Sequence, residues 1–139
     1  MDFTEPPNFA VHAVSAVCRR EQYFLLVKRA KPSYQNWLAF PGGKIERGET
    51  PVEALRRELK EETDLTAHEF RHLTTINLVD TPFKRPSYFL SVYEAFGVEG
   101  EAKPGDDAAE IYWLTLPQMQ KHRTIPSVLE IAQKLALRP

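Results

Sequence analysis

The stretch RRELKEETD, from Arg56 to Asp64, sets three glutamates within five positions and beside two arginines. If this stretch is helical, Glu58, Glu61 and Glu62 stand at i, i+3 and i+4, so their carboxylates share one face. Like charges placed in this way repel each other by roughly 0.2 to 0.5 kcal/mol per pair. Some other interaction must therefore offset this repulsion.

The residues just upstream predict where the helix begins. Thr50 can serve as the N-cap, Pro51 suits the first helical position, and Glu53 completes a capping box with Thr50. Apolar residues then follow at i, i+3 and i+7, which gives the helix a buried stripe of Val52, Leu55 and Leu59. The acidic face is expected to border this stripe instead of pointing squarely at water.

The segment PGGKIERGET, residues 41–50, adds three glycines and a further acid, Glu49, immediately before the helix. A tight turn there can bring backbone carbonyls close to the carboxylate face. Taken alone, the helix is equally consistent with a solvated face on which Arg57 is the i,i+4 partner of Glu53 and Glu61. With the upstream turn included, converging hard oxygen ligands favour a site for Mg²⁺ or Mn²⁺.

The remaining patterns predict one domain over residues 1–139, with a mixed α/β or α+β sandwich in which helices pack on a sheet. The first two strands, Val11–Val17 and Tyr23–Arg29, are expected to form a hairpin. Further strands are expected at 37–40, 72–79, 87–96 and 111–114, and two final helices at 116 to about 122 and 127 to about 137.

Composition excludes several classes of protein. The net charge of -1 and a pI near 6.4 argue against a general binder of nucleic acid or of membrane surfaces. Cys18 is the only cysteine, so no intramolecular disulfide can form. The first residues lack the pattern of a secretory leader, and no apolar run approaches 18 residues. We therefore expect a cytoplasmic protein, and the composition leaves open a small anionic ligand bound with a metal.

The segment from Gly43 to Leu65 resembles the signature of the Nudix hydrolases, G-x5-E-x7-R-E-U-x-E-E-x-G-U, in which U is aliphatic. Its specified positions are filled here by Gly43, Glu49, Arg57, Glu58, Leu59, Glu61, Glu62 and Leu65. The one departure is Asp64, where the family has glycine at the helix C-terminus. Because Asp tolerates the left-handed conformation better than most residues, we expect a slightly less stable helix end and an intact site.

The flanking segments WLAFPGGKIE and GDDAAEIYWL are also similar to family members, so the resemblance spans most of the chain. It implies an α/β/α sandwich, with a mixed sheet and helices on both sides. It also implies a pyrophosphohydrolase that uses Mg²⁺ or Mn²⁺ and cleaves a nucleoside diphosphate linked to another group. A homodimer is compatible with the resemblance.

The resemblance assigns roles to residues. It implies that Glu58, Glu61 and Glu62 ligate the cation together with the backbone carbonyl of Gly42, while Glu49 and Arg57 pair and hold the loop against the helix. The general base is Glu58 or one of the acids in the later loop. Those acids are Asp106, Asp107 and Glu110. Two basic residues are candidates for binding substrate, namely Arg29 and Lys44.

The resemblance leaves two substrate classes open. FPGGKIERGET is very similar to enzymes that hydrolyse oxidised purine triphosphates, whereas PGDDAAEIYWL and Pro82 are more similar to ADP-ribose pyrophosphatases. We favour ADP-ribose or a related sugar nucleotide. Three aromatic residues are candidates for stacking on a base, although each also suits ordinary packing: Tyr34, Phe83 and Tyr88.

Two other functions compete with this interpretation. His68 to His72 matches the H-E-x-x-H pattern of zinc proteases. That chemistry needs both histidines on one helical face, but the segment follows a helix stop and runs into a β-branched strand pattern. The alternative from another class is a non-catalytic module of the same fold that only senses a nucleotide. Such modules typically have lost one or more glutamates of the signature. This chain keeps all of them, so an enzyme is favoured.

Overall fold

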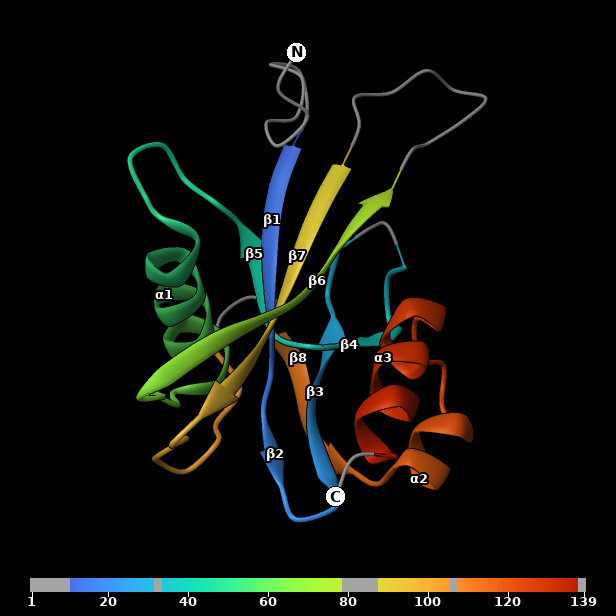
Figure 1. The fold of residues 1–139 in the computed structure, drawn as a ribbon. Coiled ribbons are helices and arrows are strands. Elements are labelled where there is room, and N and C mark those ends of the chain that lie inside the picture. The colour runs from blue at the N-terminus through green and yellow to red at the C-terminus, as the bar shows by residue number, and fades with distance from the viewer. Residues whose placement is uncertain (1–10, 32–33, 79–87, 106–107, 138–139) are drawn as a thin grey trace.

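A computed structural model describes residues 11–31, 34–78, 88–105 and 108–137 (Figure 1). Its elements, in chain order, are β1 (Val11–Val17), β2 (Arg19–Arg20), β3 (Tyr23–Arg29), β4 (Leu38–Ala39), β5 (Gly42–Lys44), α1 (Pro51–Thr63), β6 (Glu69–Leu78), β7 (Tyr88–Phe96), β8 (Ala108–Leu114), α2 (Leu116–Gln120) and α3 (Pro126–Ala136).

The strands form two sheets. In the first, with the order β5-β1-β7-β6, β1 runs parallel to β7 and the other pairs are antiparallel. In the second, β3 pairs antiparallel with β2, β4 and β8. Figure 1 shows α1 on one side of the strands and α2 and α3 on the other. The predicted mixed sandwich with helices on both sides is thus confirmed.

The predicted pairing of the first two strands is wrong. In the described residues β1 pairs with β5 and β7, and the hairpin is formed by β2 and β3. Five consecutive residues of β1, from Ala13 to Val17, are buried, so this strand is covered on both faces. A strand of that kind carries no solvent-facing side to indicate its partner, and its neighbours come from distant parts of the chain.

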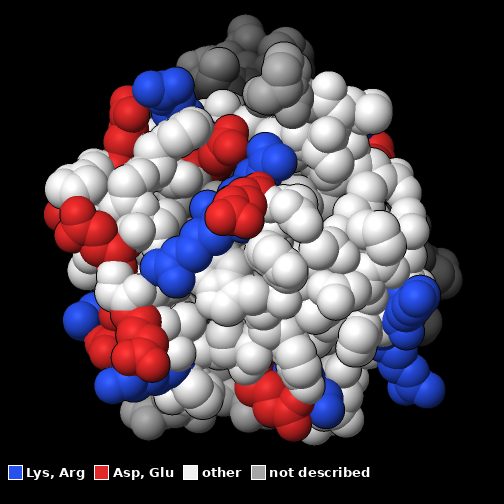
Figure 2. Space-filling view, turned by 90° about the horizontal axis from the view of Figure 1, so that it is seen from below, with Lys and Arg blue, Asp and Glu red and all other residues white. Residues whose placement is uncertain are grey.

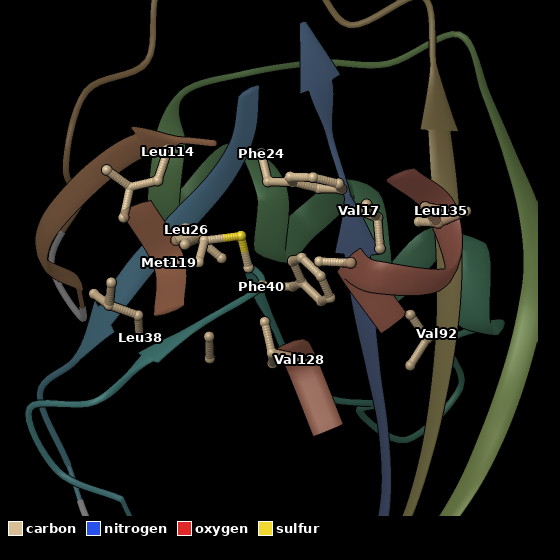
Figure 3. Close-up of a cluster of buried hydrophobic side chains, with 12 residues drawn as sticks. Val17, Phe24, Leu26, Leu38, Phe40, Val92, Leu114, Met119, Val128 and Leu135 are labelled. Carbon is tan, nitrogen blue, oxygen red and sulfur yellow. The ribbon is translucent and has the colours of Figure 1, made fainter. Parts of the chain in front are cut away.

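Two hydrophobic clusters flank the strands. Figure 3 shows the first, in which Val128 and Leu135 of α3 meet Val17, Phe24 and Phe40. The second joins Val14, Ala16 and Leu25 to three residues of α1, namely Ala54, Leu55 and Leu59. Residues of α2 and α3 therefore belong to the first cluster and residues of α1 to the second, and α1 is fixed against β1 and β5.

The start of α1 agrees with the prediction. Thr50 Oγ1 accepts a hydrogen bond from Glu53 N at 3.1 Å, and Glu53 Oε1 accepts one from Thr50 N at 2.9 Å. Leu55 and Leu59 of the predicted stripe are buried, whereas Val52 is half-buried. The capping box and the stripe together orient the helix about its own axis, which fixes where its glutamates lie.

Several strand boundaries differ from the predictions; β6, for instance, begins at Glu69 instead of His72. Ala108 to Glu110, expected in a loop, belong to β8, because they pair with the end of β3. Gly42 to Lys44, expected in a turn, form β5 through pairing with β1. The HEFRH segment enters β6 as expected, so its histidines do not share a helix. No helix in the described part of the chain is long and apolar enough to cross a membrane.

Asp64 adopts the left-handed conformation, with φ 63° and ψ 17°. Its carboxylate lies 2.9 Å from Lys60 Nζ at the surface. We predict that Asp64→Gly raises the midpoint of thermal unfolding, because glycine has no Cβ to strain at positive φ and an exposed ion pair contributes little. Asp64→Ala is the matched control and should lower it. Equal midpoints for the two variants would contradict the role assigned to the backbone.

Cys18 is fully buried in the second cluster. Burial raises the pKa of its thiol to about 12, and the nearby Arg20 only partly opposes this. We predict that a thiol reagent at neutral pH modifies Cys18 no faster than the protein unfolds, because the thiolate is the reactive form. Mass spectrometry under native conditions and in urea measures this difference, and rapid native labelling would contradict it.

Candidate active site

The site begins at β5, an edge strand of the first sheet. Pro41 and Ile45 hydrogen-bond to the backbone of β1, each at 2.9 Å. In an antiparallel pair the residues alternate between facing the partner strand and facing away from it. Gly42 and Lys44, which alternate with these residues, therefore direct their backbone polar groups away from β1, toward α1.

Side chains of α1 bind this outward edge. Gly42 N donates to Glu62 Oε2 at 3.0 Å, and the carbonyl of Lys44 accepts from Arg57 Nη2 at 3.0 Å. The carbonyl of Gly42, predicted as a metal ligand, lies on the same edge by the alternation of the strand. The edge of β5 and the acidic face of α1 thus form one continuous surface.

Gly43 allows the two elements to approach. A Cβ added at Gly43 would lie 2.5 Å from the carboxyl carbon of Glu58, which is too close for any side chain. The side chain of Glu58 is accordingly only 16% exposed. Glycine at position 43 therefore leaves room for the side chain of Glu58, which gives a physical reason for a glycine at the start of the Gly43–Leu65 segment.

Arg57 joins the glutamates of the site. Its Nε and Nη2 atoms bind Glu49 in a two-point contact of 2.7 and 2.9 Å, so the predicted pairing of Glu49 with Arg57 is present. Its Nη1 atom lies 2.8 Å from Glu58 Oε1 and 3.3 Å from Glu61 Oε2. Two carboxylates of the acidic face therefore already converge on one positive nitrogen, which offsets the repulsion between them.

The Arg57 contact predicts an acid-dependent contribution to stability. Hydrogen bonding from Arg57, with a second bond from Glu46 N, lowers the pKa of Glu49 from 4.5 to about 2. A lowered folded-state pKa stabilises the fold above the unfolded value, so this contribution is full above about pH 4.5 and is lost as the pH falls toward about 2.

We predict that Glu49→Gln removes this contribution. Urea midpoints of the wild type and of Glu49→Gln should differ most at about pH 6 and approach each other as the pH falls through about 4 to about 2.5. Glu130→Gln, on the exposed side of α3, serves as the control and should follow the wild type. Curves that stay parallel over the whole range would contradict a lowered pKa at Glu49.

The donor set suits a hard divalent cation. Glu58, Glu61 and Glu62 supply carboxylate oxygens, the ligands that Mg²⁺ and Mn²⁺ prefer. The carboxylates of Glu58 and Glu61 both contact the positively charged Arg57 Nη1 atom. Within the described ranges, no three acidic, histidine or cysteine side chains are grouped closely enough to hold a metal ion. As they stand, these carboxylates serve Arg57 and the amide of Gly42.

The loop that precedes the other predicted acids meets α1 at its C-terminal end. Gly105 N donates to the carbonyl of Glu62 at 2.9 Å, and a Cβ on Gly105 would lie 1.6 Å from the carbonyl oxygen of Glu61. Asp106 and Asp107 follow directly but lie outside the described residues. Glu110, on β8, is exposed and lies 4.0 Å from Lys28 Nζ. The sequence analysis did not predict that residues 103–105 pack against the end of α1. Gly105, which allows this close approach, was the available signal.

The predicted substrate-binding residues lie on strand ends. Arg29 ends β3 and is half-buried, and Lys44 ends β5 with an exposed side chain. Of the aromatic candidates, Tyr34 is 48% exposed and its ring packs edge-on against Trp37 at 5.2 Å. Phe83 and the side chain of Tyr88 lie outside the described residues.

The histidines of the HEFRH segment have other partners. His68 Nε2 lies 2.8 Å from Glu99 Oε1, and His72 Nε2 lies 2.8 Å from Thr75 Oγ1. The two histidines therefore do not converge on a zinc position, in agreement with the interpretation drawn from the sequence.

Comparisons with known proteins agree with this geometry. The model of the NUDIX domain family matches residues 10–135. An ADP-ribose pyrophosphatase of Methanocaldococcus jannaschii is 33% identical over 111 residues, which cover 78% of this chain and 64% of that protein. An 8-oxo-dGTP diphosphatase of Escherichia coli is 42% identical over 59 residues, which cover 42% of this chain and 46% of that protein.

The fold has a solved counterpart. The crystal structure of a MutT NUDIX hydrolase from Burkholderia pseudomallei superposes with a TM-score of 0.77 at 21% identity, covering 90% of this chain and 96% of that one. This match establishes the shared fold. The chain spans less than two thirds of the length of the two curated relatives described above.

Proposed function

The chain belongs to the NUDIX family, and on that premise we propose that it is a pyrophosphohydrolase that cleaves a nucleoside diphosphate linked to another group. The observation that carries this proposal is the set of carboxylates of Glu58, Glu61 and Glu62 along one face of α1, facing the edge of β5. Nothing in the packing of α1 requires three acids there, because its buried stripe lies beside them.

The proposed cofactor is Mg²⁺ or Mn²⁺, since Nudix hydrolases generally use divalent cations. Glu58, Glu61 and Glu62 would hold it, with the carbonyl of Gly42. When bound, such a cation polarises a phosphoryl group and lowers the pKa of an attacking water. Arg57 keeps Glu58 and Glu61 turned toward one point, and Glu49 holds Arg57 in place. These two residues thus orient the ligands without touching the substrate.

The proton of the attacking water needs an acceptor, and two positions supply one. Glu58 lies within the carboxylate set, and Glu110 is the third residue of β8. The pH dependence of kcat/KM separates them, because removal of the base abolishes the acidic limb of the profile. We therefore propose to identify the base by measuring the pH dependence of kcat/KM for Glu58→Gln and Glu110→Gln.

The proposed substrate is ADP-ribose or a related sugar nucleotide. The relative named for ADP-ribose matches over 78% of this chain, whereas the relative named for 8-oxo-dGTP matches over 42% of it, although at higher identity. The longer match includes more of the chain outside the acidic helix, where a substrate would be recognised. An 8-oxo-dGTP diphosphatase is the second candidate, supported by the local identity of 42%.

The charge distribution supports a small-molecule substrate. Figure 2 shows acidic and basic side chains interspersed on the face it presents, with no broad basic surface on the described part of that face. Together with a net charge of -1, this supports a protein with no nucleic-acid partner. We also propose that it acts in the cytoplasm.

The test is hydrolysis of a panel of nucleotides in the presence of Mg²⁺ or Mn²⁺. ADP-ribose, other sugar nucleotides, 8-oxo-dGTP and dGTP are incubated with the protein, and products are separated by chromatography. Turnover of ADP-ribose above the others supports the proposal, and turnover of 8-oxo-dGTP alone supports the second candidate. Nucleotide binding without turnover would replace both with a sensing role.

A further inference from the structure

A groove of about 550 Å³ runs beside β8, outside the carboxylate set of α1. Its walls include Ile111 and Trp113 of β8, Pro104 of the preceding loop, and Arg20 of β2. Among the described residues β8 pairs only with β3, so the groove follows its other edge. We call this space the β8 groove.

The β8 groove shares with the candidate active site the loop that ends at Gly105. Glu110, a candidate general base, lines it. Pro104 also lines it and precedes Gly105, whose amide binds the carbonyl of Glu62 at the end of α1. A diphosphate at the carboxylates of α1, with its neighbouring group in the groove, is the arrangement that the proposal below requires.

Arg20 is held in place within the groove. Its guanidinium lies 4.8 Å from the centre of the Trp113 ring, and its Nη2 atom donates to the carbonyl of Gly100 at 2.9 Å. A guanidinium carries five N–H donors, and the bond to Gly100 uses one of them. The contact with Trp113 already orders the long side chain of Arg20. This side chain therefore loses less conformational freedom when a ligand binds.

The charges of the groove favour a neutral ligand. Among the described residues, its lining contains one basic residue, Arg20, and two acidic residues, Glu101 and Glu110, which gives these residues a net charge of -1. An acidic lining repels a free phosphate or pyrophosphate. Carboxylates accept hydrogen bonds from hydroxyl groups, a guanidinium donates to them, and an apolar aromatic wall contacts a ring. This combination suits a polyhydroxylated ring such as a sugar.

We propose that the β8 groove binds the sugar attached to the diphosphate of the substrate, and that it selects sugar nucleotides over nucleoside triphosphates. The proposal rests on the proposed function and names the part of the site that recognises the second moiety. A nucleoside triphosphate would instead direct charged phosphate toward the acidic lining. The groove therefore distinguishes the two candidate substrate classes of this chain.

The test compares Arg20→Gln with Arg71→Gln. Arg71 is a matched control, since it is also exposed, lies 4.5 Å from the centre of the Phe96 ring, and is on β6, outside the groove. Steady-state kinetics with ADP-ribose and with 8-oxo-dGTP are measured for each variant. We expect Arg20→Gln to lower the ratio of kcat/KM for ADP-ribose to that for 8-oxo-dGTP by about tenfold, through KM, and Arg71→Gln to leave it unchanged.

A second variant and a binding measurement keep the outcomes distinct. Glu101→Gln, at an exposed position, should shift the same ratio in the same direction. If the ratio is unchanged in both groove variants, the groove assignment is wrong while the proposed function stands. If the wild type hydrolyses no nucleotide, the proposed function fails, and calorimetric titration with ADP-ribose decides the groove: binding weakened by Arg20→Gln supports it, and binding that is absent or unaffected overturns it.

Discussion

Replacing Glu58 or Glu61 with glutamine is expected to lower kcat by about 10²- to 10³-fold while the protein stays folded. Both carboxylates converge on Arg57 Nη1, and both belong to the proposed set of cation ligands. Glutamine has the same shape as glutamate but no charge, and a neutral amide is a weak ligand for Mg²⁺. The loss of charge stabilisation in the transition state amounts to several kcal/mol, and each 1.4 kcal/mol is a tenfold change in rate.

The stability of these variants separates a catalytic role from a structural one. Removing one charge from the i, i+3, i+4 set relieves a repulsion of roughly 0.2 to 0.5 kcal/mol per pair. The amide oxygen of the introduced glutamine can still accept a hydrogen bond from Arg57. Thermal unfolding should therefore show a midpoint equal to or slightly above that of the wild type. A large loss of activity together with unchanged stability identifies a functional carboxylate.

Glu130→Gln is the control for this pair of variants. Glu130 also lies on a helix and forms an i,i+4 contact of 3.4 Å, with Lys134, but it is on α3. Its replacement should leave kcat unchanged. If Glu58→Gln and Glu61→Gln retain most of the wild-type rate, the acidic face of α1 is a solvated surface and the metal assignment is wrong.

The parts of this fold that sequence predicted best are local. The N-cap at Thr50, the capping box with Glu53 and the buried Leu55 and Leu59 depend on residues within a few positions of each other. The left-handed conformation of Asp64 was also predictable, because the family signature that the segment resembles has glycine at this position.

The parts that sequence could not predict are long-range. The partners of β1 are β5 and β7, and the parallel partner comes from a segment more than 70 residues further along the chain. The β8 groove likewise joins Arg20 to Gly100 across 80 residues. At Arg57, helical spacing alone favoured Glu53 and Glu61 as partners, and only the family resemblance indicated Glu49; Glu53 is used in the capping box, and the shortest contact is with Glu49. Spacing gives the partners available on the helix, whereas the packed loop decides which one is used.

Leu55→Ala is expected to destabilise the protein by about 3 to 5 kcal/mol without a specific effect on catalysis. Leu55 is 1% exposed and belongs to the cluster that holds α1 against β1. Alanine removes its apolar contacts and leaves a cavity, because the strands beneath are fixed by their own pairing. The loss is a large share of the roughly 5 to 15 kcal/mol typical of a domain, and it should lower the midpoint by roughly 10 °C or more.

Leu137→Ala makes the same chemical change at a residue that is 87% exposed, just beyond α3, and should alter the urea midpoint very little. Urea unfolding gives the free energy of both variants, and kcat is measured at a temperature where Leu55→Ala remains folded. Leu55→Ala should then keep a kcat near that of the wild type, the reverse of the result expected for Glu61→Gln. A loss of kcat without a loss of stability would show that Leu55 acts on the carboxylates directly, and equal midpoints for the two leucine variants would show that the contact of α1 with β1 does not hold the fold together.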